Sequence, residues 1–114
     1  TNQRSSIAAW DSRDQRPLSA LVSWQDVRAA DRAQELQASG FFVTPNVSVS
    51  KAEWIVRNVA GARDAADART LRLGGMEAWL VAKMTGGAHL CDHANASATG
   101  FYAHLEEDWD ALGI

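Results

Sequence analysis

Three side chains with metal-binding chemistry stand at alternate positions near the C-terminal end of the sequence, namely His89, Cys91 and His93. In an extended strand alternate side chains share one face, and imidazole nitrogen and thiolate sulfur are both zinc ligands. A structural zinc site takes four ligands, however, and no fourth ligand stands at a usual spacing. We therefore favour a strand edge with incidental histidines over a metal site. Asp92 and His93 are not expected to form an acid–base unit, because neighbouring residues on a strand point to opposite faces.

Two glycine pairs, Gly74-Gly75 and Gly86-Gly87, are the sequence's candidates for a phosphate-binding loop. Neither pair has the spacing of a dinucleotide-binding or Walker-type loop. Both are better explained as turns and helix caps, where glycine adopts backbone conformations that other residues avoid.

Trp24 and Arg4 are candidate binding residues. Trp24 ends an apolar segment that we expect to be a strand, and ligand crevices of α/β sheets open at the carboxyl ends of strands. Its flat indole ring suits the carbon face of a sugar or polyol. Arg4 precedes an expected strand and offers hydrogen-bond donors to hydroxyl groups. The alternative for Arg4 is an ion pair with Asp11 or Asp14.

The first half of the chain is expected to place these residues on a hairpin followed by a helix. Residues 6–10 and 18–24 have strand character and flank a polar turn, so an antiparallel pairing is predicted. A helical pattern begins at Asp26, which can cap it, and ends at Gly40, where a C-terminal glycine belongs.

The second half of the sequence alternates helical and extended patterns. Ser50 and Glu53 have the spacing of a capping box, which predicts that a helix begins there. The remaining expected elements are an ordered loop or short strand at residues 41–46, helical turns at 61–68, a strand at 70–73, a helix at 76–84, a strand at 88–92, a loop at 95–100 and an acidic segment at 105–114, within which the Trp-Asp pair at 109–110 is helix-like.

Composition limits the class of protein. With 114 residues, 46% of them hydrophobic and 22% charged, the chain is one globular domain or less. The net charge of −3 with interspersed signs argues against nucleic-acid binding. No apolar run approaches the ~20 residues that span a bilayer, and a single cysteine cannot form an internal disulfide. These features predict a cytoplasmic protein. Since the sequence starts without Met and stops abruptly, we expect it to be an internal piece of a longer chain.

Five motifs occur in order along the sequence: TNQR at 1–4, SWQDVR at 23–28, PNVSVSKAEW at 45–54, GGMEAWLVAKMTGG at 74–87 and DHANASATG at 92–100, followed by WD at 109–110. Together they resemble the FGGY carbohydrate kinases, and among these the glycerol kinases most. The resemblance spans the whole chain.

The resemblance implies an α/β fold, specifically a partial actin-like, ribonuclease H-like ATPase domain with a mixed sheet and flanking helices. Residues 1–114 would be an incomplete segment of the N-terminal domain. The implied reaction is transfer of the ATP γ-phosphoryl group to a carbohydrate hydroxyl, with an Asp base and Mg²⁺. ATP and Mg²⁺ would be bound by parts of the parent enzyme outside this segment, so the segment alone would not catalyse. Its partners would be a sugar or polyol and the rest of the kinase chain, and a homo-oligomer is left open.

The resemblance also implies four substrate-binding positions. Arg4 matches the arginine that glycerol kinases use on polyol hydroxyls, and Trp24 matches the tryptophan that packs on the carbons. Ser5 stands where glycerol kinases have Glu, and Asn46 where they have Tyr. Loss of a carboxylate removes a hydrogen bond worth about 1.5–3 kcal/mol, so a larger or differently hydroxylated polyol, or a ketose as in a pentulose kinase, becomes an alternative acceptor. A further alternative is a non-catalytic, stand-alone remnant that binds a polyol or acts as an interaction module.

Overall fold

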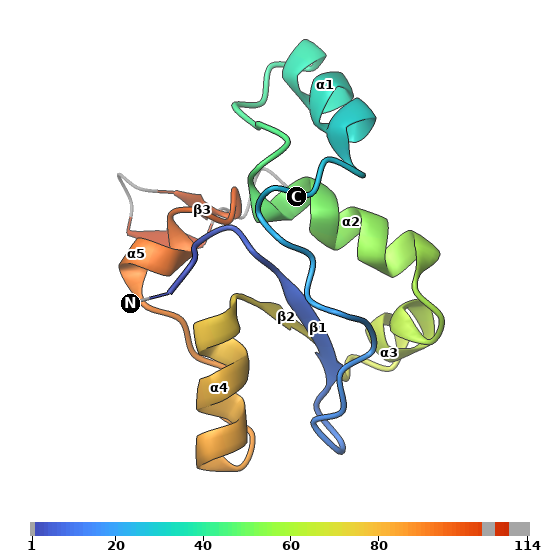
Figure 1. Cartoon of the computed structure of the whole chain (residues 1–114), viewed down its shortest axis with the longest axis vertical. Helices are drawn as coiled ribbons and strands as arrows, with labels where there is room; N and C mark the ends of the chain where they lie inside the picture. Colours follow the sequence, from blue (N-terminus) through green and yellow to red (C-terminus); the bar gives the residue numbers. More distant parts are fainter. Residues whose placement is uncertain (1, 104–106, 110–114) are drawn as a thin grey trace.

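The computed structural model describes residues 2–103 and 107–109, with helices packed on both sides of a short central sheet (Figure 1). The elements follow the chain in this order: β1 (Ala8–Asp11), α1 (Ala30–Ala38), α2 (Ser48–Asn58), α3 (Ala62–Asp67), β2 (Leu71–Gly74), α4 (Met76–Thr85), α5 (His93–Ala96), β3 (Tyr102–Ala103) and β4 (Asp108–Trp109).

The central sheet pairs β1 with β2 in antiparallel register, from Ala8 opposite Gly74 to Asp11 opposite Leu71. The expected strand at 18–24 is wrong, because these residues form no regular strand: Val22 makes an isolated bridge with Ile7, and Pro17, just before the segment, makes another with Trp10. Pro17 has no N–H to donate to a ladder, which limits regular pairing at this edge. The segment nevertheless runs antiparallel beside β1, as the hairpin prediction required.

Alternation along residues 7–10 places apolar side chains on both faces of the sheet. Ile7 and Ala9 belong to a buried cluster with Val22 and residues of α2 and α3, including Ile55, which is fully buried. Trp10, on the opposite face, is buried against Ala78 and Ala82 of α4. Figure 1 shows the same layers, with α2 and α3 on one side of the sheet and α4 on the other. Burial of both faces explains why this strand is almost wholly apolar.

Helix α1 begins at Ala30, four residues later than predicted, and Asp26 does not cap it. The Asp26 carboxylate instead accepts the Arg28 backbone N–H at 2.9 Å, closing a local turn before the helix starts. The predicted end is confirmed: Gly40, with φ of 93°, follows the C-cap residue Ser39, and the Gly40 N–H donates to the Gln37 carbonyl at 3.0 Å. A left-handed backbone at this position favours glycine.

Helix α2 begins at Ser48, so the predicted capping box at Ser50 and Glu53 is wrong. Val49 donates its N–H to the Thr99 carbonyl at 2.9 Å, and this tertiary contact supplies a partner in the first turn. Ser50 lies inside the helix and is fully buried, whereas the Glu53 carboxylate forms ion pairs with Arg32 and Arg57. Tertiary contacts therefore replaced the local cap that the sequence pattern indicated.

The helical turns at 61–68, the strand at 70–73 and the helix at 76–84 are confirmed by α3, β2 and α4. Residues 88–92 form no strand, and the predicted loop at 95–100 begins within α5, which Asp92 caps by accepting the Asn95 N–H at 3.1 Å. Tyr102 of β3 pairs with Trp109 of β4, so the expected helical character is wrong at Trp109. Residues 105–106 and 110–114 of that acidic segment lie outside the described residues.

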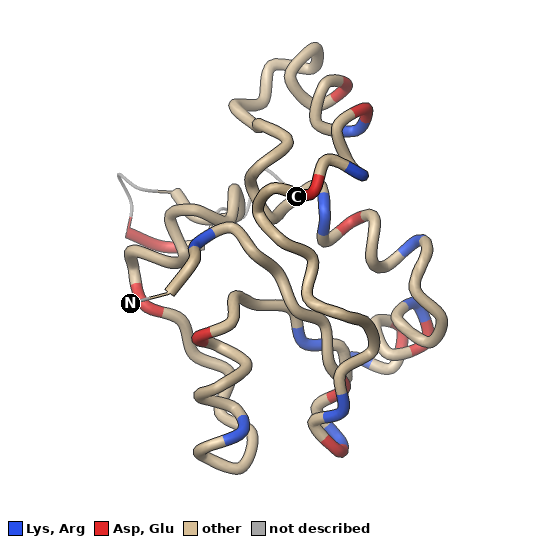
Figure 2. The backbone as a smooth tube through the Cα atoms, viewed as in Figure 1, with Lys and Arg blue, Asp and Glu red and all other residues tan. Residues whose placement is uncertain are grey.

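Several aspartates pair with an arginine two positions later, as in Asp11/Arg13, Asp14/Arg16 and Asp26/Arg28. In each pair the carboxylate also accepts the arginine backbone N–H at 2.9 Å. Such local turns keep charges of opposite sign together, and Figure 2 shows acidic and basic residues interleaved along the backbone. Within the described part of the chain, no helix combines the length and apolar character needed to cross a bilayer.

Candidate functional site

A fully buried lysine, Lys51 of α2, lies where three segments of the chain converge. Its Nζ donates hydrogen bonds to the carbonyl oxygens of Asn46 at 2.7 Å, Trp24 at 3.2 Å and Ser5 at 3.3 Å. These acceptors are 5, 27 and 46 positions earlier in the sequence. Three of the four predicted substrate-binding positions are therefore held by one ammonium group.

Side-chain and backbone bonds connect the same segments further. Asn46 Nδ2 donates to the Trp24 carbonyl at 3.1 Å, and the Trp24 N–H donates to Ser6 Oγ at 3.1 Å. Trp24 is 37% exposed, so its ring is available at the surface. The prediction that Trp24 ends a strand is wrong, because it lies in a turn after the isolated bridge at Val22.

Ser5 and Arg4 form a turn at the start of the described chain. Ser5 has a positive φ of 64°, a conformation that is uncommon for residues other than glycine. Its hydroxyl donates to the Ala98 carbonyl at 3.1 Å. Arg4 is exposed and forms no hydrogen bond or ion pair with any residue that the structure describes. The alternative ion pairs for Arg4 are not present, since Asp11 is paired with Arg13 and Asp14 with Arg16.

The electrostatics of Lys51 follow from its burial. Desolvation lowers the pKa of the ammonium below its ordinary value, and the Asp26 carboxylate acts in the opposite direction. Three carbonyl dipoles replace the water that the ammonium loses on burial. Lys51 was not among the site residues predicted from the sequence. A usable signal existed, because Lys51 and Ile55 are four positions apart and therefore share one face of a helix.

The three candidate metal ligands are engaged by different partners. His89 Nε2 lies 2.9 Å from the Leu73 carbonyl oxygen, Cys91 Sγ donates to Glu77 at 3.4 Å, and His93 Nδ1 lies 2.6 Å from the Tyr102 hydroxyl. Because residues 88–92 are not a strand, the shared face that the spacing suggested does not form. Within the described ranges, no three His, Cys, Asp or Glu residues are grouped so that they could hold a metal ion.

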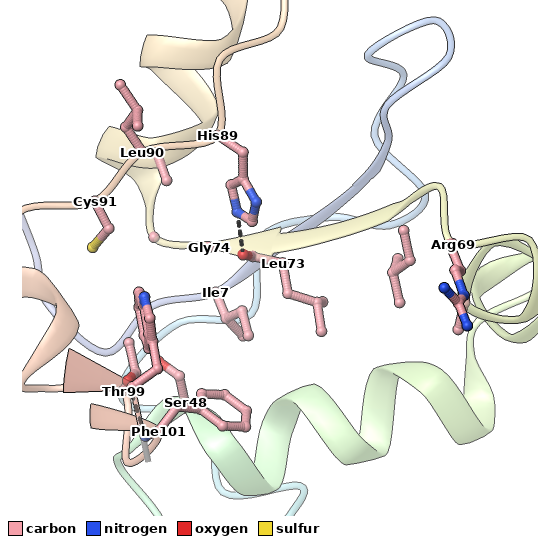
Figure 3. Close-up of a pocket in the computed structure, with 15 residues that line it drawn as sticks. Ile7, Ser48, Arg69, Leu73, Gly74, His89, Leu90, Cys91, Thr99 and Phe101 are labelled. Atoms are coloured by element: carbon pink, nitrogen blue, oxygen red, sulfur yellow. Dashed lines mark hydrogen bonds between the residues drawn. The ribbon is translucent and has the colours of Figure 1, made fainter. Parts of the chain in front are cut away.

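A groove of about 590 Å³ lies beside β2, and its lining includes Leu73, His89 and Cys91. Figure 3 shows His89 and Leu90 along one wall and Phe101, Thr99 and Ser48 along the other. Its lining is mainly apolar, with Arg69 the one arginine or lysine among the lining residues. None of the four predicted substrate-binding residues lines it. The groove and the predicted substrate-binding positions are therefore separate parts of the structure.

The described residues do not fit ATP or Mg²⁺. The N-terminus of α4 follows Gly74-Gly75, but the Glu77 carboxylate occupies the space beside Gly75, within 2.7 Å of where a Cβ would stand. A carboxylate there opposes a phosphate group electrostatically. Together with the lack of a carboxylate cluster among the described residues, this argues against a nucleotide or metal site on the part of the chain that the structure describes.

Comparison with known proteins identifies the family of this chain. Residues 1–112 match the model of the N-terminal domain of the FGGY family of carbohydrate kinases. The chain belongs to this family. The expected resemblance is thereby confirmed over almost the whole sequence.

The FGGY relatives of known identity include glycerol kinases from Halothermothrix orenii, 38% identical, and Bacillus licheniformis, 34% identical. Each match covers 96% of this chain and 24% of the relative, so the chain spans about a quarter of their length. Among solved structures, the Plasmodium falciparum glycerol kinase with ADP has a TM-score of 0.91 at 26% identity, covering 99% of this chain and 24% of that one.

A xyloylose kinase from Brucella ovis has a TM-score of 0.77 at 24% identity, covering 97% of this chain and 23% of that chain. Similarity at this level shows the fold alone. Both structures confirm the expected fold, a partial actin-like α/β ATPase domain. The strands that the present structure describes pair antiparallel, and helices flank them as expected.

Proposed function

We propose that this chain is part of an ATP-dependent polyol kinase and contributes one side of the pocket for the phosphoryl acceptor. The observation that carries the proposal is the convergence of Ser5, Trp24 and Asn46 on Lys51, because residues up to 46 positions apart meet where the family resemblance implies substrate contacts. The family match supports the kinase class.

Each acceptor-binding residue has a distinct role in this proposal. Arg4, exposed and without a partner among the described residues, donates its guanidinium hydrogens to acceptor hydroxyls. The partly exposed Trp24 ring packs on the carbon chain of the acceptor. Ser5 and Asn46 supply small polar groups at the positions that set which acceptor fits.

Nucleotide and metal belong to other parts of the enzyme in this proposal. Neither fits the described residues, whereas the P. falciparum relative was solved with ADP. When bound, ATP supplies the γ-phosphoryl group that an acceptor hydroxyl attacks in line, and Mg²⁺ neutralises the phosphates. The residues of this chain bind and orient the acceptor, which raises the effective concentration of its hydroxyl. Cytoplasmic location is part of the proposal, and the oligomeric state is left open.

Glycerol or a closely related small polyol is the acceptor that we propose, in place of a pentulose. The relatives between 33% and 38% identical are glycerol kinases, whereas the xyloylose kinase resembles this chain at the level of fold. The exchanges at Ser5 and Asn46 weaken the contact with glycerol relative to those enzymes, because a carboxylate acceptor and an aromatic ring are missing.

The test is a kinase assay on the complete polypeptide that carries this chain, with ATP and a panel of glycerol, longer polyols and ketoses. We expect ADP formation with a small polyol. Arg4→Ala and Trp24→Ala should each raise the acceptor KM by about 10-fold or more while the KM for ATP stays within about 2-fold.

Arg16→Ala is the matched control, because Arg16 is an exposed arginine in a turn, paired only locally with Asp14. This variant should leave both KM values unchanged. Absence of ADP formation with every acceptor would refute the kinase assignment. Nucleotide binding by residues 1–114 alone would refute the assignment of ATP to other parts of the enzyme.

A further inference from the structure

The ammonium of Lys51 uses all of its hydrogen-bonding capacity inside the protein. A protonated lysine has three donor hydrogens, and Lys51 Nζ has three carbonyl acceptors, those of Ser5, Trp24 and Asn46. The residue is fully buried, so its side chain does not reach solvent. A ligand at the surface therefore meets the segments that Lys51 holds, but not Lys51 itself.

Burial of this charge without a carboxylate partner is energetically unfavourable unless its hydrogen bonds are satisfied. Across the residues whose positions are described, every ion pair involves an arginine, and none includes Lys51. Asp26, which influences the ammonium through space, is bound to Arg28. A methionine or leucine at this position of α2 would fill the same space without desolvating a charge. Compared with methionine or leucine, lysine therefore adds the three hydrogen bonds to carbonyl oxygens and no better packing.

One of the three acceptors belongs to a strained residue. Ser5 has φ of 64°, and a non-glycine residue in this region is held there at a cost of about 1 kcal/mol or more. Such a conformation persists only where surrounding contacts fix it. For Ser5 those contacts are Lys51 Nζ on its carbonyl and the Ala98 carbonyl on its hydroxyl. Arg4 is the preceding residue, so the direction of its side chain depends on this turn.

The other two acceptors lie in segments without regular secondary structure. Trp24 and Asn46 are both in turns, and their mutual bond joins Asn46 Nδ2 to the same Trp24 oxygen that Lys51 contacts. Loops of this kind have few backbone hydrogen bonds of their own, so a buried donor that joins them limits their movement.

We propose that Lys51 is a positioning residue for acceptor binding, which holds the backbone of Ser5, Trp24 and Asn46 in the arrangement that binds a polyol. This inference rests on the proposed function. It adds a residue that does not touch the substrate, and it predicts that loss of the ammonium changes acceptor affinity selectively.

The test compares Lys51→Met with Lys83→Met in the complete kinase polypeptide. Lys83 is the other lysine of the sequence and is exposed on α4, which makes it a matched control. We expect Lys51→Met to raise the KM for the polyol at least 10-fold with the KM for ATP changed less than 2-fold. Lys83→Met should change neither value. KM does not depend on the amount of folded enzyme, so a role in stability alone would lower the yield or the melting temperature and leave the acceptor KM unchanged.

Lys51→Arg keeps the positive charge, but the N–H donors of its guanidinium lie in one plane and cannot donate to three converging carbonyl oxygens with the geometry of an ammonium. If Lys51→Met does not fold, Lys51→Arg is measured in its place, with an expected 3- to 10-fold rise in acceptor KM. If the variant that folds has an unchanged acceptor KM, the inference about Lys51 is overturned. Polyol kinase activity of the wild type would still support the proposed function in that case. A wild-type polypeptide without polyol kinase activity would instead remove the function on which the inference rests.

Discussion

Asn46 Nδ2 lies 3.1 Å from the carbonyl oxygen of Trp24, 22 positions earlier, and ties two turns of the proposed acceptor pocket together. Asn46→Ala removes this bond, and a neutral hydrogen bond contributes about 0.5–1.5 kcal/mol. We expect the acceptor KM of the complete kinase to rise by roughly 2- to 10-fold, measured by steady-state kinetics.

Asn58→Ala is the control for this prediction. Asn58 Nδ2 also donates to a tryptophan carbonyl, that of Trp54, at 2.9 Å, but within one turn of α2 and on an exposed surface. The Asn58→Ala variant should leave the acceptor KM unchanged. Equal effects of the two variants would contradict a specific role for the link between Asn46 and Trp24.

The family resemblance implies that Ser5 replaces a Glu of glycerol kinases, and Ser5 adjoins the exposed Arg4. Ser5→Glu introduces a carboxylate, and a hydrogen bond to a charged group contributes about 1.5–3 kcal/mol. We expect the KM for glycerol to fall by roughly 10-fold or more, in competition assays against longer polyols. Ser39→Glu, at the exposed end of α1, should have no such effect. An unchanged preference in Ser5→Glu would remove Ser5 from the specificity-determining positions.

The Asp11 carboxylate is buried beneath Arg13, with a 2.5 Å ion pair to Nη2 and a 2.9 Å bond from the backbone N–H. Hydrogen bonds from the Arg13 side chain lower the pKa of Asp11 from 3.8 to about 2. Because the folded-state pKa is depressed, the stabilisation is fully present above pH 3.8 and is lost as the pH falls from there through about 2.

Urea unfolding of the wild type and of Asp11→Asn between pH 6 and pH 2 measures this contribution. The difference in unfolding free energy should be constant above about pH 5 and narrow steadily below pH 4. Arg13→Ala removes the guanidinium and brings the folded-state pKa of Asp11 back toward its ordinary value, so it should reduce the pH-dependent part of that difference. A difference that does not depend on pH would show that the carboxylate charge is not the stabilising group.

Cys91 is the one cysteine of the sequence, and it is exposed. Desolvation of the thiol, followed by the hydrogen bond to Glu77, nevertheless raises its pKa from 9.0 to about 12. Thiolate is the reactive form, so at pH 8 the reactive fraction is smaller by ~10³ than for an unperturbed thiol. We expect iodoacetamide to alkylate Cys91 correspondingly slowly, as followed by mass spectrometry of the peptide that contains it.

Glu77→Gln removes the neighbouring negative charge and should accelerate this alkylation. Glu35→Gln, on the exposed surface of α1, is the control and should not. Alkylation of Cys91 in the folded protein at the rate of the urea-unfolded protein would contradict the raised pKa.

Elements whose signals are local were predictable from the sequence. The glycines after α1 and α4 ended their helices as expected, because a left-handed residue closes a helix without help from distant segments. The short apolar run at residues 6–10, followed by turn-forming residues, likewise predicted a strand, and β1 lies there. The order of short motifs identified the family, which the match over residues 1–112 confirms.

Elements that depend on distant partners were not predictable in this way. Ser50 and Glu53 have the pattern of a capping box, but the Thr99 carbonyl supplies a first-turn partner for α2 and Arg32 binds the Glu53 carboxylate. The alternating segment at 88–92 forms no strand, because its His89 and Cys91 side chains are bound by Leu73 and Glu77 instead of facing one partner.

For the proposed site, sequence by itself determined the residue types and, through the motifs, which of them to expect near a substrate: Arg4, Ser5, Trp24 and Asn46. Only the tertiary structure decided that three of them share a buried ammonium. Helical spacing places Lys51 on the same face as Ile55, yet no local rule says that a lysine on a buried face meets carbonyl groups 5, 27 and 46 positions away. That meeting depends on how the turns pack against α2, because an ammonium can be buried only where the fold brings acceptors to it.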